Sequence, residues 1–234
     1  MLHAAALALA AWTVSAPTRC PDDGSVSIHA AEDGYVVVRL LGDDSHRCLL
    51  KGGTYRELDP EALQGRVMFG IDDLAVQWLL VERAAFVRGA LPSAQATLEA
   101  YYDFEMSHLR AQPIVVRSLE RFDLFDVTGP DGRRRTFLVW KAVLGDAPGP
   151  QFWVATAHPR GIVVLSVGGR SESASKALVD SYLDTFSSVD AESCAALRKE
   201  RARPGKRPAT PARDPDRPPT DGDPPAARTA PRPS

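Results

Sequence analysis

The feature that most constrains the fold is a run of apolar residues in the last third of the chain. Within residues 162–167 every residue except Ser166 is aliphatic, so an extended strand there has two apolar faces. Residues 137–140, Phe-Leu-Val-Trp, repeat this pattern. A strand that is apolar on both faces is buried on both faces. The sheet that contains these strands must therefore be covered from two sides.

Further extended segments surround this run, with short turns between them. The alternation of apolar residues and the turn residues predict strands at 25–28, 35–41, 48–51, 66–71, 75–83, 114–121, 122–128, 135–144, 152–157 and 161–167. Consecutive strands with short turns pair antiparallel. We therefore expect a largely antiparallel β-sheet.

Helices are predicted in three places. Residues 93–112 have Ser93 as N-cap and Pro113 as terminator, and Leu98, Tyr102, Met106 and Leu109 form one apolar stripe. A final helix is expected over 173–187, and a short one over 59–65. The two long helices can cover the two faces of the sheet. The predicted fold is α+β, with a largely antiparallel sheet flanked by helices on both faces (an α/β/α sandwich).

The last third also resembles a known family. The aromatic-bearing strand Gln-Phe-Trp-Val-Ala at 151–155 leads through a hairpin into Gly-Ile-Val-Val-Leu-Ser at 161–166, and a Gly/Ser linker leads into the helix at 176–186. In this order the chain resembles the PsbP-like superfamily, which includes extrinsic photosystem proteins, Ran-binding Mog-type proteins and bacterial exported proteins. The resemblance covers residues 26–189. It implies a fold and a mostly non-enzymatic binding or assembly role, with no shared site residues.

The N-terminus has the texture of an export signal. Residues 4–16 are apolar and end in Val14, Ser15 and Ala16, an acceptable cleavage triplet. Against this, residues 1–3 carry no Lys or Arg, and Pro17 follows the cut. A buried first strand or helix, with a cytoplasmic location, is the alternative. No apolar run of transmembrane length follows residue 20, so no membrane span is expected in the mature chain.

The C-terminal segment has a different composition from the rest. Residues 198–234 carry ten basic and five acidic side chains, a net +5, so the remainder of this chain of net charge −2 is −7. The segment holds ten prolines and no aromatic residue, which predicts disorder. The expected division is a signal peptide at 1–16, one domain at 17–189, a short helix or frayed extension at 190–203, and a disordered Pro/Arg-rich tail at 204–234. The tail either contacts anionic surfaces or keeps the chain solvated.

The cysteines are Cys20, Cys48 and Cys194. In an exported protein one disulfide is expected, and three pairings are possible. Among these pairings Cys20–Cys48, which would join the N-terminal arm to the first hairpin, is singled out as a hypothesis, and the sequence leaves the choice among the three open. Reduced, buried cysteines are the alternative.

The candidate catalytic and metal-binding groups lack the motifs that normally accompany such sites. Residues 43–48, Asp-Asp-Ser-His-Arg-Cys, gather possible metal ligands, but no second ligand motif accompanies them. Ser166, His158 and Asp126 are the residue types of a triad, without the nucleophile-elbow motif. No catalytic, cofactor-binding or metal-binding residue is therefore predicted.

Binding motifs are equally sparse. Gly168, Gly169 and Arg170 precede the last helix without a phosphate-loop spacing, and they are interpreted as a linker. The Arg run at 133–135 is interpreted as an exposed hairpin end. Three tryptophans lie among aliphatic residues and are assigned to the core: Trp78, Trp140 and Trp153. No basic patch with interleaved aromatics appears, so nucleic acid is not an expected partner.

These observations favour an exported, non-catalytic binding or accessory protein with a protein or envelope partner and no cofactor. The alternative is an envelope-associated enzyme, such as a hydrolase, whose site is assembled from scattered residues. A deep pocket lined by His or carboxylates would favour the enzyme, and a shallow surface with an exposed apolar patch would favour the binding protein.

Overall fold

The computed structural model describes residues 20, 22, 24–58, 68–145, 147–190 and 192–194. The predicted signal peptide (1–16), the predicted short helix (59–65) and the predicted tail (204–234) lie outside these residues. Of the predicted extension at 190–203, residues 192–194 are helical.

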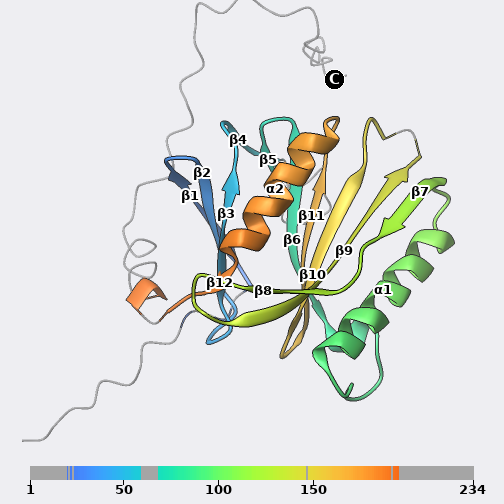
Figure 1. Cartoon of the computed structure of the whole chain (residues 1–234), viewed down its shortest axis with the longest axis horizontal. Helices are drawn as coiled ribbons and strands as arrows, with labels where there is room; N and C mark the ends of the chain where they lie inside the picture. The colour runs from blue at the N-terminus through green and yellow to red at the C-terminus, as the bar shows by residue number, and fades with distance from the viewer. Residues whose placement is uncertain are drawn as a thin grey trace, which may run out of the picture.

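The strands form two sheets, and all pairs of named strands are antiparallel (Figure 1). The larger sheet has the order β4-β5-β6-β11-β10-β9-β7, and β8 also pairs with β9. Its strands are β4 (Tyr55–Glu57), β5 (Met68–Ile71), β6 (Leu74–Glu82), β7 (Val116–Arg121), β8 (Phe125–Thr128), β9 (Arg134–Leu144), β10 (Gln151–His158) and β11 (Gly161–Gly168). The smaller sheet has the order β1-β2-β3-β12, from β1 (Val26–Ala31), β2 (Gly34–Arg39), β3 (His46–Lys51) and β12 (Ser187–Ser188). The predicted antiparallel pairing is confirmed.

Strand β11 lies in the middle of the larger sheet, between β6 and β10. Its residues from Gly161 to Val167 are all buried, so the prediction that this strand is covered on both faces is confirmed. Residues on one face, including Ile162 and Val164, join the apolar cluster around Trp140 and Trp153. Residues on the other face join a second cluster around Trp78. All three tryptophans are therefore in the core, as predicted.

Helix α1 (Ala94–Ala111) belongs to the first cluster. Ser93 caps it by accepting a hydrogen bond from the Ala96 amide at 3.1 Å, and the helix stops at Gln112, immediately before Pro113. Its buried residues are Thr97, Leu98, Tyr101, Met106 and Leu109. The predicted stripe is correct except that Tyr101 takes the buried place expected for Tyr102. The Tyr102 ring lies edge-on to Trp140 with the Arg121 guanidinium over it, 4.7 Å from its centre.

Helix α2 (Glu172–Thr185) belongs to the second cluster, together with inward-facing residues of β2 and β3. In Figure 1 it runs between the smaller sheet and the larger one. It is joined to β3 by side-chain hydrogen bonds: the Leu49 amide donates to Thr185 Oγ1 at 2.8 Å, and the Lys51 amide donates to Ser181 Oγ at 3.2 Å.

The expected single sheet between helical layers needs correction at this point. Strands β1–β3 do not extend the larger sheet but form a second sheet. This second sheet and α2 together cover the face of the larger sheet that carries Trp78. Short turns dictate that neighbouring strands pair, but they do not dictate where one sheet ends and another begins.

The disulfide joins Cys20 to Cys194, so the hypothesised pairing Cys20–Cys48 is wrong. The reason is the alternation of side chains in the smaller sheet. Cys48 points into the main core and is a free, buried thiol, whereas Cys20 and Cys194 pack with Leu40 in a third cluster. Within the described residues, no helix has the length and apolar character needed to cross a membrane.

Candidate functional site

The three residue types of a triad do not come together. Ser166 lies opposite Trp153 in the β10–β11 hairpin, whereas His158 lies opposite Gly161 at the other end. The two side chains also belong to opposite faces of the sheet, because Ser166 shares the face of Val164. Asp126 on β8 accepts hydrogen bonds from Thr136 Oγ1 at 2.7 Å and from Arg134.

The cluster at residues 43–48 does not form a metal site. His46 is buried with its ring stacked on Phe186, at 4.8 Å between ring centres, and Cys48 lies in the core. In the described part of the chain, no group of three or more His, Cys, Asp or Glu side chains is placed to hold a metal ion.

The glycines before α2 do not leave an open anion site. Ser171 caps the helix by accepting a hydrogen bond from the Ala174 amide at 3.2 Å. Glu172 occupies the first turn and forms an ion pair with Lys141 at 2.7 Å. The positive end of the helix dipole already faces a carboxylate.

The arginines at 133–135 hold the β8–β9 turn in place. Arg135 forms an ion pair with Asp131 at 2.5 Å, and Arg134 forms one with Asp126 at 2.5 Å. Arg133 donates to Ser188 Oγ on β12 at 3.2 Å. The run therefore connects the two sheets, which its interpretation as an exposed hairpin end did not include.

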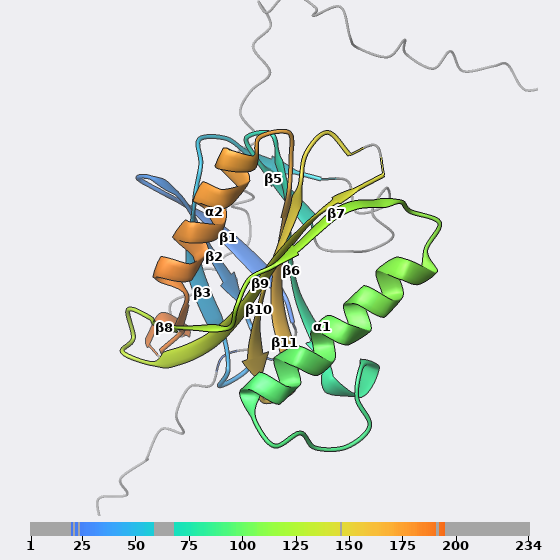
Figure 2. The same cartoon turned by 45° about the vertical axis from the view of Figure 1, so that its right-hand side comes forward.

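A groove of about 440 Å³ lies between α1 and the face formed by β6, β11 and β10. Figure 2 shows α1 crossing the sheet beside these strands. The groove is lined by Gln77, Leu79, Val81, Tyr101, Phe104, Glu105, His108, Leu109, Gln112, Ile114, Leu144, Gln151, Trp153, Val164 and Ser166.

A row of uncharged polar side chains crosses the floor of this groove. Gln77 on β6 is directly opposite Ser166 on β11, and Gln151 Nε2 on β10 donates to Ser166 Oγ at 2.7 Å. The Nε2 atom of Gln77 is buried and has no hydrogen-bond partner among the residues that the structure describes. The rest of the floor is apolar, with Leu79 and Trp153 among its residues. The groove thus has one polar row within an apolar surface.

Helix α1 supplies the wall, with Tyr101, Glu105, His108 and Gln112 at helical spacing. The Tyr101 hydroxyl donates to Glu105 Oε2 at 3.4 Å, and His108 Nε2 lies 2.6 Å from Gln112 Nε2. Burial raises the pKa of the Glu105 carboxyl, and burial beside Glu105 raises the pKa of Tyr101. Among the residues that line this groove none is Lys or Arg.

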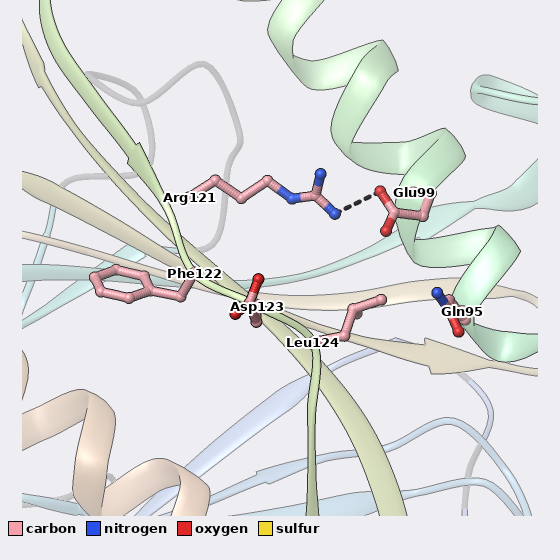
Figure 3. A pocket seen from close by; sticks show the side chains of 6 residues that line it. All are labelled: Gln95, Glu99, Arg121, Phe122, Asp123 and Leu124. Carbon is pink, nitrogen blue, oxygen red and sulfur yellow. Dashed lines mark hydrogen bonds and ion pairs between the residues drawn. The ribbon is translucent and has the colours of Figure 1, made fainter.

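A smaller pocket of about 320 Å³ lies at the other side of α1 (Figure 3). Arg121 reaches across it to Glu99 on the helix, at 2.5 Å. Phe122, Asp123 and Leu124 form its floor. Arg121, the one cationic residue in the lining of this pocket, already has Glu99 as its ion-pair partner.

The groove contains Glu, His and Ser, the residue types of acid–base catalysis, but they are not hydrogen-bonded to one another as in a catalytic site. Glu105 is hydrogen-bonded to Tyr101, His108 to Gln112 and Ser166 to Gln151. Among the described hydrogen bonds none joins Ser166 to His108 or Glu105. A nucleophile needs a base within hydrogen-bond reach, so this geometry suits binding better than covalent catalysis.

The groove was not predicted from the sequence. Its signal was Gln77 and Ser166, polar residues that interrupt two otherwise apolar strands and share one face in the antiparallel register. Ser166 was considered only as a nucleophile. Interpreted as an interruption of a buried strand, it would have marked the floor of a polar concavity.

Comparison with known proteins bears on the fold alone. The structure is similar to the solution structure of cyanobacterial PsbP (CyanoP) from Synechocystis sp. PCC 6803, with 15% sequence identity and a TM-score of 0.35. The match covers 71% of this chain and 94% of that chain. A protein of the PsbP type, the group that the sequence resembles, is thus among the structural matches. No protein-family model and no curated protein sequence matches the chain.

Proposed function

We propose that this chain is an exported, non-catalytic binding or accessory protein, and that the groove beneath α1 binds its ligand. The observation that carries the proposal is the Gln77 carboxamide, whose buried Nε2 has no partner inside a groove of about 440 Å³. A buried donor without an acceptor destabilises the unliganded protein, so a ligand that supplies the acceptor gains binding energy.

Two further observations support the proposal. Phe104 and Ile114, both at the groove, keep 36% and 40% of their surface exposed, and apolar side chains at a concavity favour contact with a partner or ligand. The Cys20–Cys194 disulfide supports export, because such bonds persist in oxidising compartments. Cleavage after Ala16 would leave Cys20 in the mature chain.

The test compares the native protein with a groove-filling variant. Leu79→Trp places a large ring on the groove floor, and Leu119→Trp makes the same change on exposed strand β7, away from the groove. Each protein is purified from the envelope fraction and its bound small molecules are measured by native mass spectrometry. We expect a ligand on the native protein and on Leu119→Trp, and none on Leu79→Trp. Equal occupancy of both variants would contradict the groove as the binding site.

The envelope hydrolase remains the second candidate because Glu105 and His108 face the same groove and burial raises the pKa of Glu105. A carboxyl with a raised pKa is the usual form of a general acid. Assays of hydrolysis with chromogenic esters and glycosides between pH 5 and 8 test the hydrolase hypothesis. Turnover by the native protein that Glu105→Gln abolishes would support the enzyme and overturn the non-catalytic proposal.

A further inference from the structure

We infer that the groove beneath α1 takes an uncharged amphiphile: an apolar chain or ring that carries one carbonyl group, such as a carboxamide. This inference rests on the proposed binding function and specifies the class of ligand. It follows from three properties of the groove: its charge, its unused hydrogen-bonding groups and the distribution of its apolar surface.

The charge of the groove disfavours an anionic ligand. Apart from Tyr101, the ionisable side chains that line it are Glu105 and His108, and no lining residue is Lys or Arg. A ligand carboxylate or phosphate would therefore lack a fixed counter-charge and would lie in the same groove as the Glu105 carboxyl. Burial raises the pKa of that carboxyl, which weakens the attraction that it offers to a ligand cation.

The unused hydrogen-bonding groups on the groove floor are donors, so the ligand needs an acceptor atom beside Gln77 and Ser166. Gln77 Nε2 is buried without a partner, and Ser166, directly opposite on β11, already accepts from Gln151 Nε2. A ligand carbonyl oxygen at this position accepts the bond that Gln77 is missing. The Ser166 hydroxyl proton is the second donor in the row, because Ser166 uses only its acceptor side toward Gln151.

The apolar surface of the groove determines the size and the apolar character of the rest of the ligand. Leu79, Val164 and Trp153 continue the floor beyond the polar row, and Leu109 and Ile114 face them from the helix side. A volume of about 440 Å³ lies within the range of about 300–1,000 Å³ that small-molecule sites occupy. The ligand is therefore a small molecule with one polar end, and its apolar part lies along Leu79 and Trp153.

Three probes with the same ten-carbon chain test the ligand class at pH 7.5, below their micelle concentrations. They are decanamide (neutral), decanoate (anionic) and decylammonium (cationic), and binding is followed by calorimetry and by tryptophan fluorescence, since Trp153 lines the groove. We expect decanamide to bind at least ten-fold more tightly than either charged probe. Gln77→Leu should weaken decanamide binding about ten-fold and leave decylammonium binding unchanged, because an ammonium group offers no acceptor to Gln77.

The outcomes separate the two proposals. If no probe binds the native protein, or if Leu79→Trp binds decanamide as well as the native protein does, the groove is not a binding site and the proposed function fails. If decanoate or decylammonium binds as tightly as decanamide, the groove stands and the uncharged ligand class is overturned. Ser166→Ala repeats the test on the second donor should Gln77→Leu lose its native circular dichroism spectrum.

Discussion

Mild acid should destabilise this protein through one buried histidine, His46 on β3. Its ring lies 5.6 Å from that of His158 on β10, between ring centres, and only 9% of the residue is exposed. Both rings are buried, and a hydrogen bond to the Asp44 backbone raises the pKa of each ring by less than burial lowers it. The charge of Arg135 also acts on His46, so a further positive charge on the His46 ring would be repelled.

The size of the effect follows from proton linkage. Burial, then the charges of His158 and Arg135, lower the pKa of His46 to about 3. In the unfolded chain a histidine pKa is about 6.5, so below that pH the unfolded state takes up a proton that the folded state does not. The free energy of unfolding therefore falls as the pH drops from about 6.5 toward 3. At pH 5 the loss from His46 alone is about 2 kcal/mol. Burial also lowers the pKa of His158, which adds a loss of the same sign.

Urea unfolding at pH 7.5 and at pH 5.0, followed by tryptophan fluorescence, measures this loss. His46→Gln should lose about 2 kcal/mol less than the native protein over the same pH interval, because it has no proton to take up. Carboxylates such as Asp131, whose pKa Arg135 lowers, lose stability in both proteins and cancel in the comparison. His29→Gln on β1 is the matched control. If His46→Gln and the native protein lose equal stability, the linkage argument is refuted.

Four further outcomes are expected. The double variant Cys20→Ser, Cys194→Ser should lower the free energy of unfolding by about 5 kcal/mol, because the disulfide closes a loop of sequence separation 174. Urea unfolding midpoints measure this change, and a loss under about 1 kcal/mol would contradict the chain-entropy reasoning. Leu98→Ala, at a fully buried position on α1, should cost about 2–5 kcal/mol by the same assay, and a neutral result would disprove its core role. Full-length protein should bind a cation exchanger at low salt and a chain stopped at Leu197 should not, because the +5 segment is removed; equal retention refutes the tail as the basic contact. Mass spectrometry of the native protein should find a mature N-terminus near Pro17, and an intact Met1 in the cytosol would overturn export.

Local signals in the sequence predicted most of the elements. Ser93 and Pro113 bound α1 because capping and the missing proline amide act within one helical turn. The two-sided apolar pattern of 162–167 predicted a central strand, because burial on both faces follows from side-chain alternation alone.

The remaining features depend on contacts between distant parts of the chain. Tyr101 takes the place of Tyr102 in the buried stripe, and the Tyr102 ring instead contacts Arg121, from a strand later in the chain. The pairing of Cys20 with Cys194 depends on which side of the smaller sheet faces the core. The groove exists because α1 covers β9, β10 and β11 but leaves Gln77 and Leu79 of β6 open to it. No short-range pattern encodes these arrangements.

The smaller sheet ends on a strand that the chain makes last. β12 at Ser187–Ser188 pairs with β3, and Cys194 bonds to Cys20, so the two ends of the domain meet on the same side of the molecule. During synthesis β1–β3 and Cys20 leave the ribosome before β12 and Cys194 have been made. The sheet edge and the cross-link can close only after Cys194 has left the ribosome. Contacts of such large sequence separation form slowly, so closure of this sheet edge and of the cross-link is a late step in the folding of the domain.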